Sequence, residues 1–278
     1  MSQSPARQTD HATSPLYWDA TRGPLQSLVF LLPVLIAYEG GTLAYRAAVG
    51  ELPVIKAQSW LAWVFEFFGA STGGGASGGA SGGALVAWLL PPVVIVVVLL
   101  SMHFAEGGKA KVRPRLWVGM WAESLVLAAP LLVFSAVMFR ASGAEAVLQG
   151  TVGSGGVGSG AQWGWMGDLL LSLGAGLYEE LVFRLIAIAA VHAVLVNALR
   201  LDAAWGAAGA IALSAVAFGL YHFDGASPFD WGLFTFYVVA GVYLAGVYLL
   251  RGFGIAVACH AVYDVVVVTL AWWQGGGG

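Results

Sequence analysis

The sequence predicts an all-α, polytopic integral membrane protein with about seven or eight transmembrane helices. Of its 278 residues, 59% are hydrophobic and only 10% are charged, whereas an ordinary soluble domain carries about 25% charged residues. The mean hydropathy is +0.81. The apolar residues form runs of about 20, the length at which a helix spans the hydrocarbon core of a bilayer. The chain is therefore expected to reside in the membrane as a multi-pass protein.

Seven apolar segments of roughly spanning length follow one another along the chain. The fourth is longer than one perpendicular crossing needs and contains Gly174 and Gly176. We expect this segment to tilt or to break at these glycines, and a break would raise the count to eight helices. The segments are Gln26–Arg46, Ala84–Ala105, Leu116–Phe139, Met166–Leu199, Ala207–Phe223, Trp231–Leu250 and Gly254–Trp273.

Short stretches outside these segments have other compositions. Ser59–Phe68 is aromatic and short, which is typical of a helix lying in the membrane interface. Ser71–Gly83 and Gly150–Gly160 are rich in glycine and are expected to be flexible linkers. The chain then divides into three parts: a polar N-terminal tail at 1–24, transmembrane helices with Gly/Ser-rich linkers at 25–160, and a C-terminal transmembrane core at 161–274.

The charges argue against a nucleic-acid partner and suggest an orientation. The net charge is −3 and no extended basic patch is present. The single cysteine, Cys259, excludes an intramolecular disulfide and a cysteine-rich metal cluster. With seven spans, eight basic residues fall on the side of the N-terminus and three on the other, so the N-terminus is predicted to be cytoplasmic. The eight are Arg7, Arg22, Lys109, Lys111, Arg113, Arg115, Arg200 and Arg251; the three are Arg46, Lys56 and Arg140.

A cluster of charges lies inside the fourth apolar segment, in the run from Tyr178 to Arg184. An ionised side chain near the bilayer centre costs about 2.5–3.5 kcal/mol on insertion scales, so intramembrane charges point to a function. Glu180 and Arg184 are four residues apart and are expected to pair on one face of the helix. Glu179 points about 100° away from Glu180. This leaves Glu179 as the freer carboxylate and the candidate general base.

Two later segments each bring a histidine into an apolar helix. Phe218 and His222 are four residues apart, as are His260 and Asp264, so each pair shares a helical face. Side chains of catalytic type can therefore converge from three helices. Two further intramembrane acids, Glu39 and Glu123, have no evident partner in the sequence, and neither is assigned a catalytic role.

These motifs, EExxxR, FxxxH and HxxxD in this order on separate apolar segments, resemble a known family. It is the CAAX-processing and bacteriocin-processing family of intramembrane glutamic endopeptidases, which includes the prenyl-protein endopeptidase Rce1 and the Abi proteins. The resemblance covers about the last third of the chain, from Tyr178 to Asp264. It implies an endopeptidase that needs neither a metal nor another cofactor.

The resemblance also implies roles for the residues. Glu179 with His222 would activate a water for attack on a peptide carbonyl, and His260 with Asp264 would stabilise the oxyanion. Glu180 and Arg184, with Phe218, would support the site. The last position is often Asn in the family. Because an ionised aspartate cannot donate a hydrogen bond to an oxyanion, Asp264 must either be protonated or orient His260 instead.

Three alternatives remain open from the residues. Glu179, His222, His260 and Asp264 have side chains that a zinc or iron centre would select, although no compact HExxH pair is present. Buried Glu, His and Arg also mark ion pathways in transporters. A non-catalytic family member would act in immunity or as a membrane scaffold. The prediction is a metal-independent, glutamate-dependent endopeptidase that acts in the lipid bilayer on a hydrophobic or lipid-modified peptide or protein.

Overall fold

The structure is a computed structural model that describes residues 17–50, 55–67, 82–108, 112–139, 164–223 and 228–274. No strand occurs among these residues, and six of the helices are long and apolar enough to cross a membrane. The prediction of an all-α polytopic membrane protein is therefore confirmed. The six candidate spans are Pro24–Val49, Pro114–Met138, Gly164–Ala198, Ala203–Tyr221, Trp231–Arg251 and Phe253–Gln274.

The predicted span Ala84–Ala105 corresponds to a further helix, α4, which carries two prolines in its interior. Its stretch Pro91–Ala105 is apolar but shorter than the six full-length candidates. The predicted number of seven or eight helices is therefore approximate. The elements are α1 (Tyr17–Arg22), α2 (Pro24–Val49), α3 (Lys56–Phe67), α4 (Gly82–Ala105), η1 (Pro114–Leu116), α5 (Trp117–Phe139), α7 (Gly164–Glu180), η2 (Leu181–Ala187), α8 (Ile188–Ala193), η3 (Val194–Ala198), α9 (Ala203–Tyr221), α10 (Trp231–Arg251) and α11 (Phe253–Gln274).

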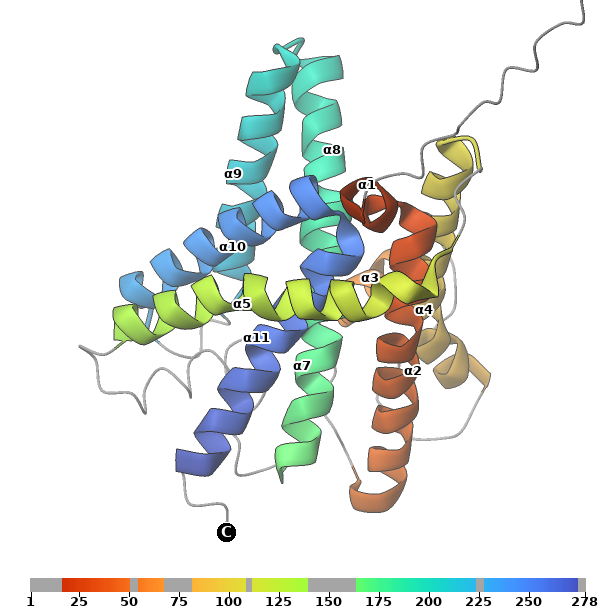
Figure 1. Cartoon of the computed structure of the whole chain (residues 1–278), viewed down its shortest axis with the longest axis vertical. Helices are drawn as coiled ribbons and strands as arrows, with labels where there is room; N and C mark the ends of the chain where they lie inside the picture. The colour runs from red at the N-terminus through yellow and green to blue at the C-terminus, as the bar shows by residue number, and fades with distance from the viewer. Residues whose placement is uncertain are drawn as a thin grey trace, which may run out of the picture.

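The helices form a bundle around α7 and α11 (Figure 1). These two pack side by side in the lower half of the view, while α8 and α9 extend upward as a hairpin. The α5 helix crosses in front of them, and α10 packs against α9, α11 and α5. As a result, the end of α7, the end of α9 and the first half of α11 meet near the middle of the molecule.

The fourth predicted span is a continuous helical segment, Gly164–Ala198, of 35 residues. The predicted break at Gly174 and Gly176 is wrong, because α7 runs through both glycines. Their role is close packing. A Cβ atom on Gly176 would lie 2.8 Å from the Cβ of Ala261 on α11, and one on Gly174 would collide with the side chains of Ile55 and Tyr38. Small residues let membrane helices approach closely in this way.

The irregularity of this segment comes a few residues later. Residues Leu181–Ala187 form a π-helical turn, η2, directly after the two glutamates. Such turns are uncommon and occur frequently at functional sites. The Ser214 hydroxyl of α9 donates a 2.6 Å hydrogen bond to the carbonyl of Phe183 inside this turn. Ser214, Phe218 and His222 are spaced by four, so one face of α9 follows η2 toward the end of α7.

The short aromatic segment predicted at Ser59–Phe68 is the helix α3, Lys56–Phe67, of 12 residues. This length is too short to cross a bilayer. Its buried residues are Ala57, Gln58 and Leu61. Four of its large apolar residues are exposed: Trp60, Trp63, Val64 and Phe67. The tail up to residue 16, the linker predicted at Gly150–Gly160 and residues 71–81 of the other predicted linker lie outside the described residues, while Gly82 and Gly83 begin α4.

A polar network closes one end of the bundle. The Arg251 guanidinium of α10 pairs with Glu123 of α5 and donates to the hydroxyl of Thr21 in α1. Tyr17 donates a 2.8 Å hydrogen bond to Glu123. Burial and the adjacent Glu123 carboxylate raise the pKa of Tyr17 to about 12, so its hydroxyl keeps the proton that it donates. The network joins three helices that are far apart in the sequence.

Candidate active site

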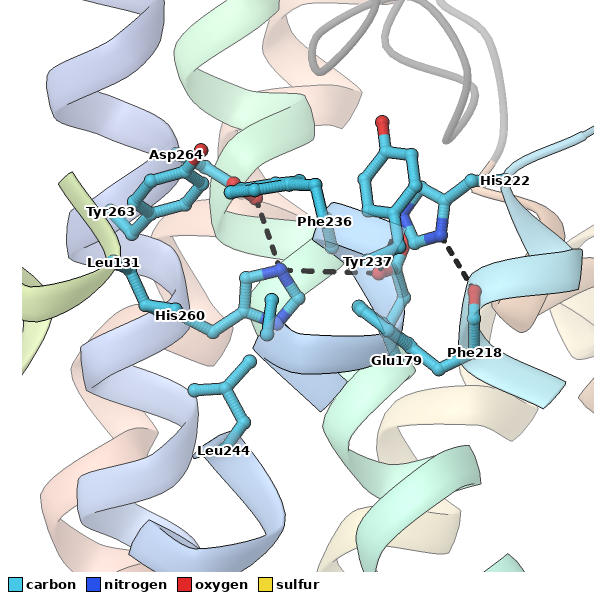
Figure 2. Close-up of a pocket in the computed structure, with 12 residues that line it drawn as sticks. Leu131, Glu179, Phe218, His222, Phe236, Tyr237, Leu244, His260, Tyr263 and Asp264 are labelled. Atoms are coloured by element: carbon cyan, nitrogen blue, oxygen red, sulfur yellow. Dashed lines mark hydrogen bonds and ion pairs between the residues drawn. The ribbon is translucent and has the colours of Figure 1, made fainter. Parts of the chain in front are cut away.

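The structure brings the three predicted motifs together in one buried site (Figure 2). Glu179 stands near the end of α7, His222 follows the last residue of α9, and His260 lies in α11. The Oε2 atom of Glu179 is 3.8 Å from Nε2 of His222 and 3.9 Å from Nε2 of His260. None of the three residues is more than 6% exposed. At these distances the three side chains share one site.

The protonation of His222 follows from its neighbours. Its Nδ1 lies 2.8 Å from the backbone carbonyl of Phe218. Because a carbonyl can only accept, Nδ1 carries the proton and donates it there. When the ring is neutral, Nε2 is an acceptor and faces Glu179. The ring also stacks on Tyr237, with centroids 3.7 Å apart and an interplanar angle of 14°.

His260 contacts all the acidic residues of the site. Its Nδ1 is 2.8 Å from Oε1 of Glu180, and its Nε2 is 3.5 Å from Oδ2 of Asp264 and faces Glu179. The contact with Asp264 is the i,i+4 pair expected from the sequence. The hydrogen bond to Glu180 was not identified by sequence reasoning, because the two residues are 80 positions apart.

Glu180 and Arg184 form the predicted ion pair, with Nε and Oε2 3.1 Å apart and both side chains no more than 1% exposed. The guanidinium carbon lies 4.3 Å from the centroid of the Phe218 ring, in a cation–π contact. Phe218 therefore makes two contacts in the site. Its ring forms the cation–π contact with Arg184, and its backbone carbonyl accepts the hydrogen bond from His222. Glu180 is shared between Arg184 and His260, which ties α7 to α11.

A small cavity of about 30 Å³ adjoins these groups. Its polar lining comes from Glu179, His222, Tyr237, His260, Tyr263 and Asp264, and its apolar lining from α5, α7, α9 and α10. A volume of this size admits a water molecule, and the lining offers several polar partners for it. It is far smaller than a peptide.

The two other intramembrane acids have partners of their own. Glu39 of α2 accepts a short hydrogen bond from the hydroxyl of Tyr178. Glu123 belongs to the network of Arg251 and Tyr17. Neither lines the cavity. Cys259 is buried and adjoins His260 only in sequence number.

Among the described residues, no group of three or more His, Cys, Asp or Glu side chains is arranged to hold a metal ion. In His222 and His260 the Nδ1 atoms are engaged by Phe218 and Glu180, so only the Nε2 atoms face the cavity. The candidate residues of the metal alternative thus lie close together without forming a recognised ligand set.

Comparison with known protein families gives a match to the second half of the chain. Residues 161–266 match the family described as type II CAAX prenyl endopeptidase Rce1-like. The matched segment contains every predicted site residue: Glu179, Glu180, Arg184, Phe218, His222, His260 and Asp264. The family resemblance seen in the three motifs is therefore confirmed. No curated protein and no solved structure matches the chain.

Proposed function

From the premise that residues 161–266 of this chain form an Rce1-like domain, we propose that the protein is an intramembrane endopeptidase in which Glu179 and His222 activate a water. The family supports a CAAX-type membrane protease. The observation that carries the finer proposal is the position of the Glu179 carboxylate. It lies within 4 Å of two buried histidine nitrogens, beside a cavity of water size.

The distance between Glu179 and His222 suits a bridging water. A separation of 3.8 Å is too long for a direct hydrogen bond. Both facing atoms accept hydrogen bonds when the glutamate is ionised and the histidine is neutral. A water in the cavity can donate one hydrogen to each, which directs its oxygen lone pairs toward a substrate carbonyl. A general base placed at this distance typically contributes a factor of about 10²–10⁴ to the rate.

The reaction then follows in two steps. As the water oxygen bonds to the carbonyl carbon, Glu179 takes a proton from the water, and the carbonyl oxygen becomes an oxyanion. Glu179 next returns this proton to the amide nitrogen as the carbon–nitrogen bond breaks. The products are a carboxylic acid and an amine. Glu179 ends in its starting form, so the cycle needs no oxidant, reductant or further reagent.

His260 is placed to stabilise the oxyanion. Its Nδ1 proton is donated to Glu180, so the ring acts on the oxyanion through a second proton on Nε2. The carboxyl groups of Glu179, Glu180 and Asp264 surround the ring and would balance its positive charge. A donor held in this way is pre-organised, and removing one such donor costs about 10²–10³ in rate in other hydrolases.

Asp264 is assigned to orientation. Its Oδ2 lies 3.5 Å from Nε2 of His260. As an ionised group it holds the imidazole ring in place, whereas a direct bond to the oxyanion would require a proton on the carboxyl group. Glu180 and Arg184 fix the other side of the same ring. The substrate class that fits is a membrane-associated peptide or protein with hydrophobic or lipid-modified residues.

Purified protein in detergent tests the proposal with a panel of hydrophobic and lipidated peptides. Wild type, Glu179→Gln and Glu39→Gln are compared with and without a strong chelator. Glu39→Gln is the matched control, because it makes the same change in another buried glutamate whose oxygen can still accept from Tyr178. Cleavage is expected to survive the chelator and Glu39→Gln, and to fall by at least about 10²-fold in Glu179→Gln.

Each other result overturns a part of the proposal. Cleavage that disappears with chelator and returns with added metal would establish a metal-dependent protease. Cleavage that persists in Glu179→Gln would show that Glu179 is not the general base. In a third case, wild type cleaves none of the peptides while Glu179→Gln keeps the cellular role of the protein. These two results together would establish a non-catalytic immunity, scaffold or transport role.

A further inference from the structure

Tyr237 brings a fourth helix, α10, into the candidate active site. It lines the small cavity together with Glu179, His222 and His260, and only 4% of it is exposed. None of the three motifs lies on α10, so sequence reasoning did not single this tyrosine out. Its ring lies face to face with the imidazole of His222 (Figure 2), with centroids 3.7 Å apart and an interplanar angle of 14°.

The backbone of His222 does little to set the plane of its ring. The α9 helix ends directly before this residue, and the His222 backbone N–H lies 3.4 Å from the Gly219 carbonyl, whereas about 2.9–3.0 Å is usual. The hydrogen bond from Nδ1 to the Phe218 carbonyl constrains one ring atom. The torsion about the Cβ–Cγ bond of a histidine has broad minima, so neighbouring side chains must set the plane of the imidazole.

Three aromatic rings pack against this imidazole in two ways. Phe218 and Tyr221 meet it edge-on, with interplanar angles of 72° and 84°, whereas Tyr237 lies nearly parallel to it. A turn about the Cβ–Cγ bond would drive the edge of the imidazole into the parallel tyrosine ring. The stack therefore favours the orientation in which Nε2 faces Glu179, with 3.8 Å between Nε2 and Oε2.

Close packing of α10 on α9 holds Tyr237 in this place. A Cβ atom on Gly219 of α9 would lie 2.8 Å from the side chain of Val238, the residue after Tyr237. One turn further along α10, a Cβ atom on Gly241 would lie 3.0 Å from the backbone of α9. Glycines at these two positions let the helices approach closely. Residues outside the cavity thus set the separation of the helices that the stack requires.

We propose that Tyr237 is a positioning residue, whose ring stacks on His222 and keeps the Nε2 atom turned toward Glu179. The kinetic part of the inference rests on the proposed function, because His222 has a rate to affect only if it helps Glu179 to activate the water. Without the tyrosine ring, the imidazole can turn about its Cβ–Cγ bond and Nε2 moves away from the water. A reacting group that is misplaced by about 1 Å can lose about 10²-fold in rate.

Tyr237→Leu and Tyr237→Phe test the inference, with Phe30→Leu as the matched control. Leucine removes the aromatic ring, whereas phenylalanine keeps the ring and removes the hydroxyl. Phe30 of α2 is also a buried aromatic residue that packs on another ring, that of Trp121 at 5.1 Å between centroids, but it does not line the cavity.

The stack predicts a different kinetic result for each variant. Tyr237→Leu is expected to lower kcat by about 10–100-fold with KM within about twofold of wild type. Tyr237→Phe should recover most of this loss, and Phe30→Leu should keep both constants within about twofold of wild type. If Tyr237→Leu does not fold, Tyr237→Met takes its place, because methionine fills more of the volume of the ring without supplying an aromatic face.

Nuclear magnetic resonance of protein with isotope-labelled histidine gives a readout that does not depend on activity. The chain contains five histidines, and the imidazole signal of His222 is the one that disappears in His222→Gln. The ring current of Tyr237 shifts this signal upfield. The signal is expected to move downfield in Tyr237→Leu and to stay close to its place in Tyr237→Phe and Phe30→Leu. An unmoved signal in folded Tyr237→Leu would overturn the inference, whatever the change in kcat.

The two readouts separate this inference from the proposed function. A moved signal with unchanged kcat would confirm the stack and overturn the positioning role, as would equal losses of kcat in Tyr237→Leu and Tyr237→Phe or in Tyr237→Leu and Phe30→Leu. A moved signal in a protein whose wild type cleaves no peptide would overturn the proposed function while supporting the stack. A moved signal together with the expected fall in kcat and its recovery in Tyr237→Phe supports both.

Discussion

At the scale of single residues, Asp264 is the candidate orienting residue of the site. It lies one helical turn from His260 and 3.5 Å from its Nε2. Asn has nearly the same shape, can still accept from the imidazole, and can in addition donate to an oxyanion. We expect Asp264→Asn to retain peptide cleavage within about tenfold, and Asp264→Ala to lose about 10²-fold. Steady-state cleavage rates measure both.

Asp168→Asn is the control for this pair of variants. Asp168 is also a buried aspartate, but it accepts from the indole of Trp272 and does not line the cavity. The Asp168→Asn variant should cleave peptides at the rate of wild type. Equal, large losses in Asp264→Asn and Asp264→Ala would contradict the expectation that a neutral acceptor is enough to orient His260, since they would show that the negative charge itself is required.

At the scale of elements, the approach of α7 to α11 sets the distance between Glu179 and His260. A Cβ atom on Gly176 would lie 2.9 Å from the backbone nitrogen of Ala261, next to His260. Backbone atoms cannot yield without moving a helix, so Gly176→Ala is expected to separate the two helices. Thermal unfolding should begin at a lower temperature, and the folded protein should lose about 10²-fold in cleavage rate.

Gly40→Ala is the matched control for Gly176→Ala. Gly40 is a helical glycine in α2 with open space around its Cβ position. There the substitution gains about 0.5–1 kcal/mol of helix stability and should leave cleavage unchanged. A Gly176→Ala protein as stable and active as Gly40→Ala would show that the two helices do not need this close contact.

The π-helical turn depends on a second element, α9. Ser214→Ala removes the hydroxyl that bonds to the Phe183 carbonyl inside η2. Leaving a buried carbonyl without its partner costs about 1–3 kcal/mol, so the variant should unfold at a lower denaturant concentration. Ser135→Ala serves as the control, because its hydroxyl donates to the carbonyl of Leu132 in its own helix, and its effect should be smaller. Indistinguishable unfolding curves would contradict the link between α9 and η2.

At the scale of the whole molecule, three of the eight basic residues that are predicted to be cytoplasmic lie at one end of the bundle: Arg22, Arg113 and Arg251. Arg22 donates to the Leu249 carbonyl near Arg251, and Gln26 exchanges hydrogen bonds with the backbone of Arg113. Positive charge concentrated on one side favours retention in the cytoplasm. We therefore expect a cysteine introduced as Arg22→Cys to react with a membrane-impermeant thiol reagent only after the membrane is opened.

The native thiol does not disturb this measurement, because Cys259 is buried. Ala48→Cys is the control, since Ala48 is an exposed residue near the far end of α2. This cysteine should react in intact cells or right-side-out vesicles. The opposite pattern of labelling would reverse the predicted orientation.

The sequence by itself determined the membrane environment and indicated the candidate residues of the site. Both follow from local properties of the sequence. Runs of about 20 apolar residues predict helices that cross the membrane. A spacing of four residues places Glu180 beside Arg184, and His260 beside Asp264, on one face of a helix, independently of the rest of the chain. The order of the three motifs along the chain was enough to indicate the resemblance to the family that residues 161–266 match. The sequence also marked α3 as a short helix of its own.

The tertiary structure decided how these parts meet. The bond between Glu180 and His260 joins residues 80 positions apart, and that between Ala57 and Tyr221 joins residues 164 apart, so the packing of whole helices sets them. The glycines of α7 were misinterpreted as a break for the same reason. A glycine weakens a helix that is considered alone. Gly176, however, allows a close contact with Ala261 that no larger side chain permits. Which of the two effects prevails depends on the neighbouring helix, and the local sequence does not contain it.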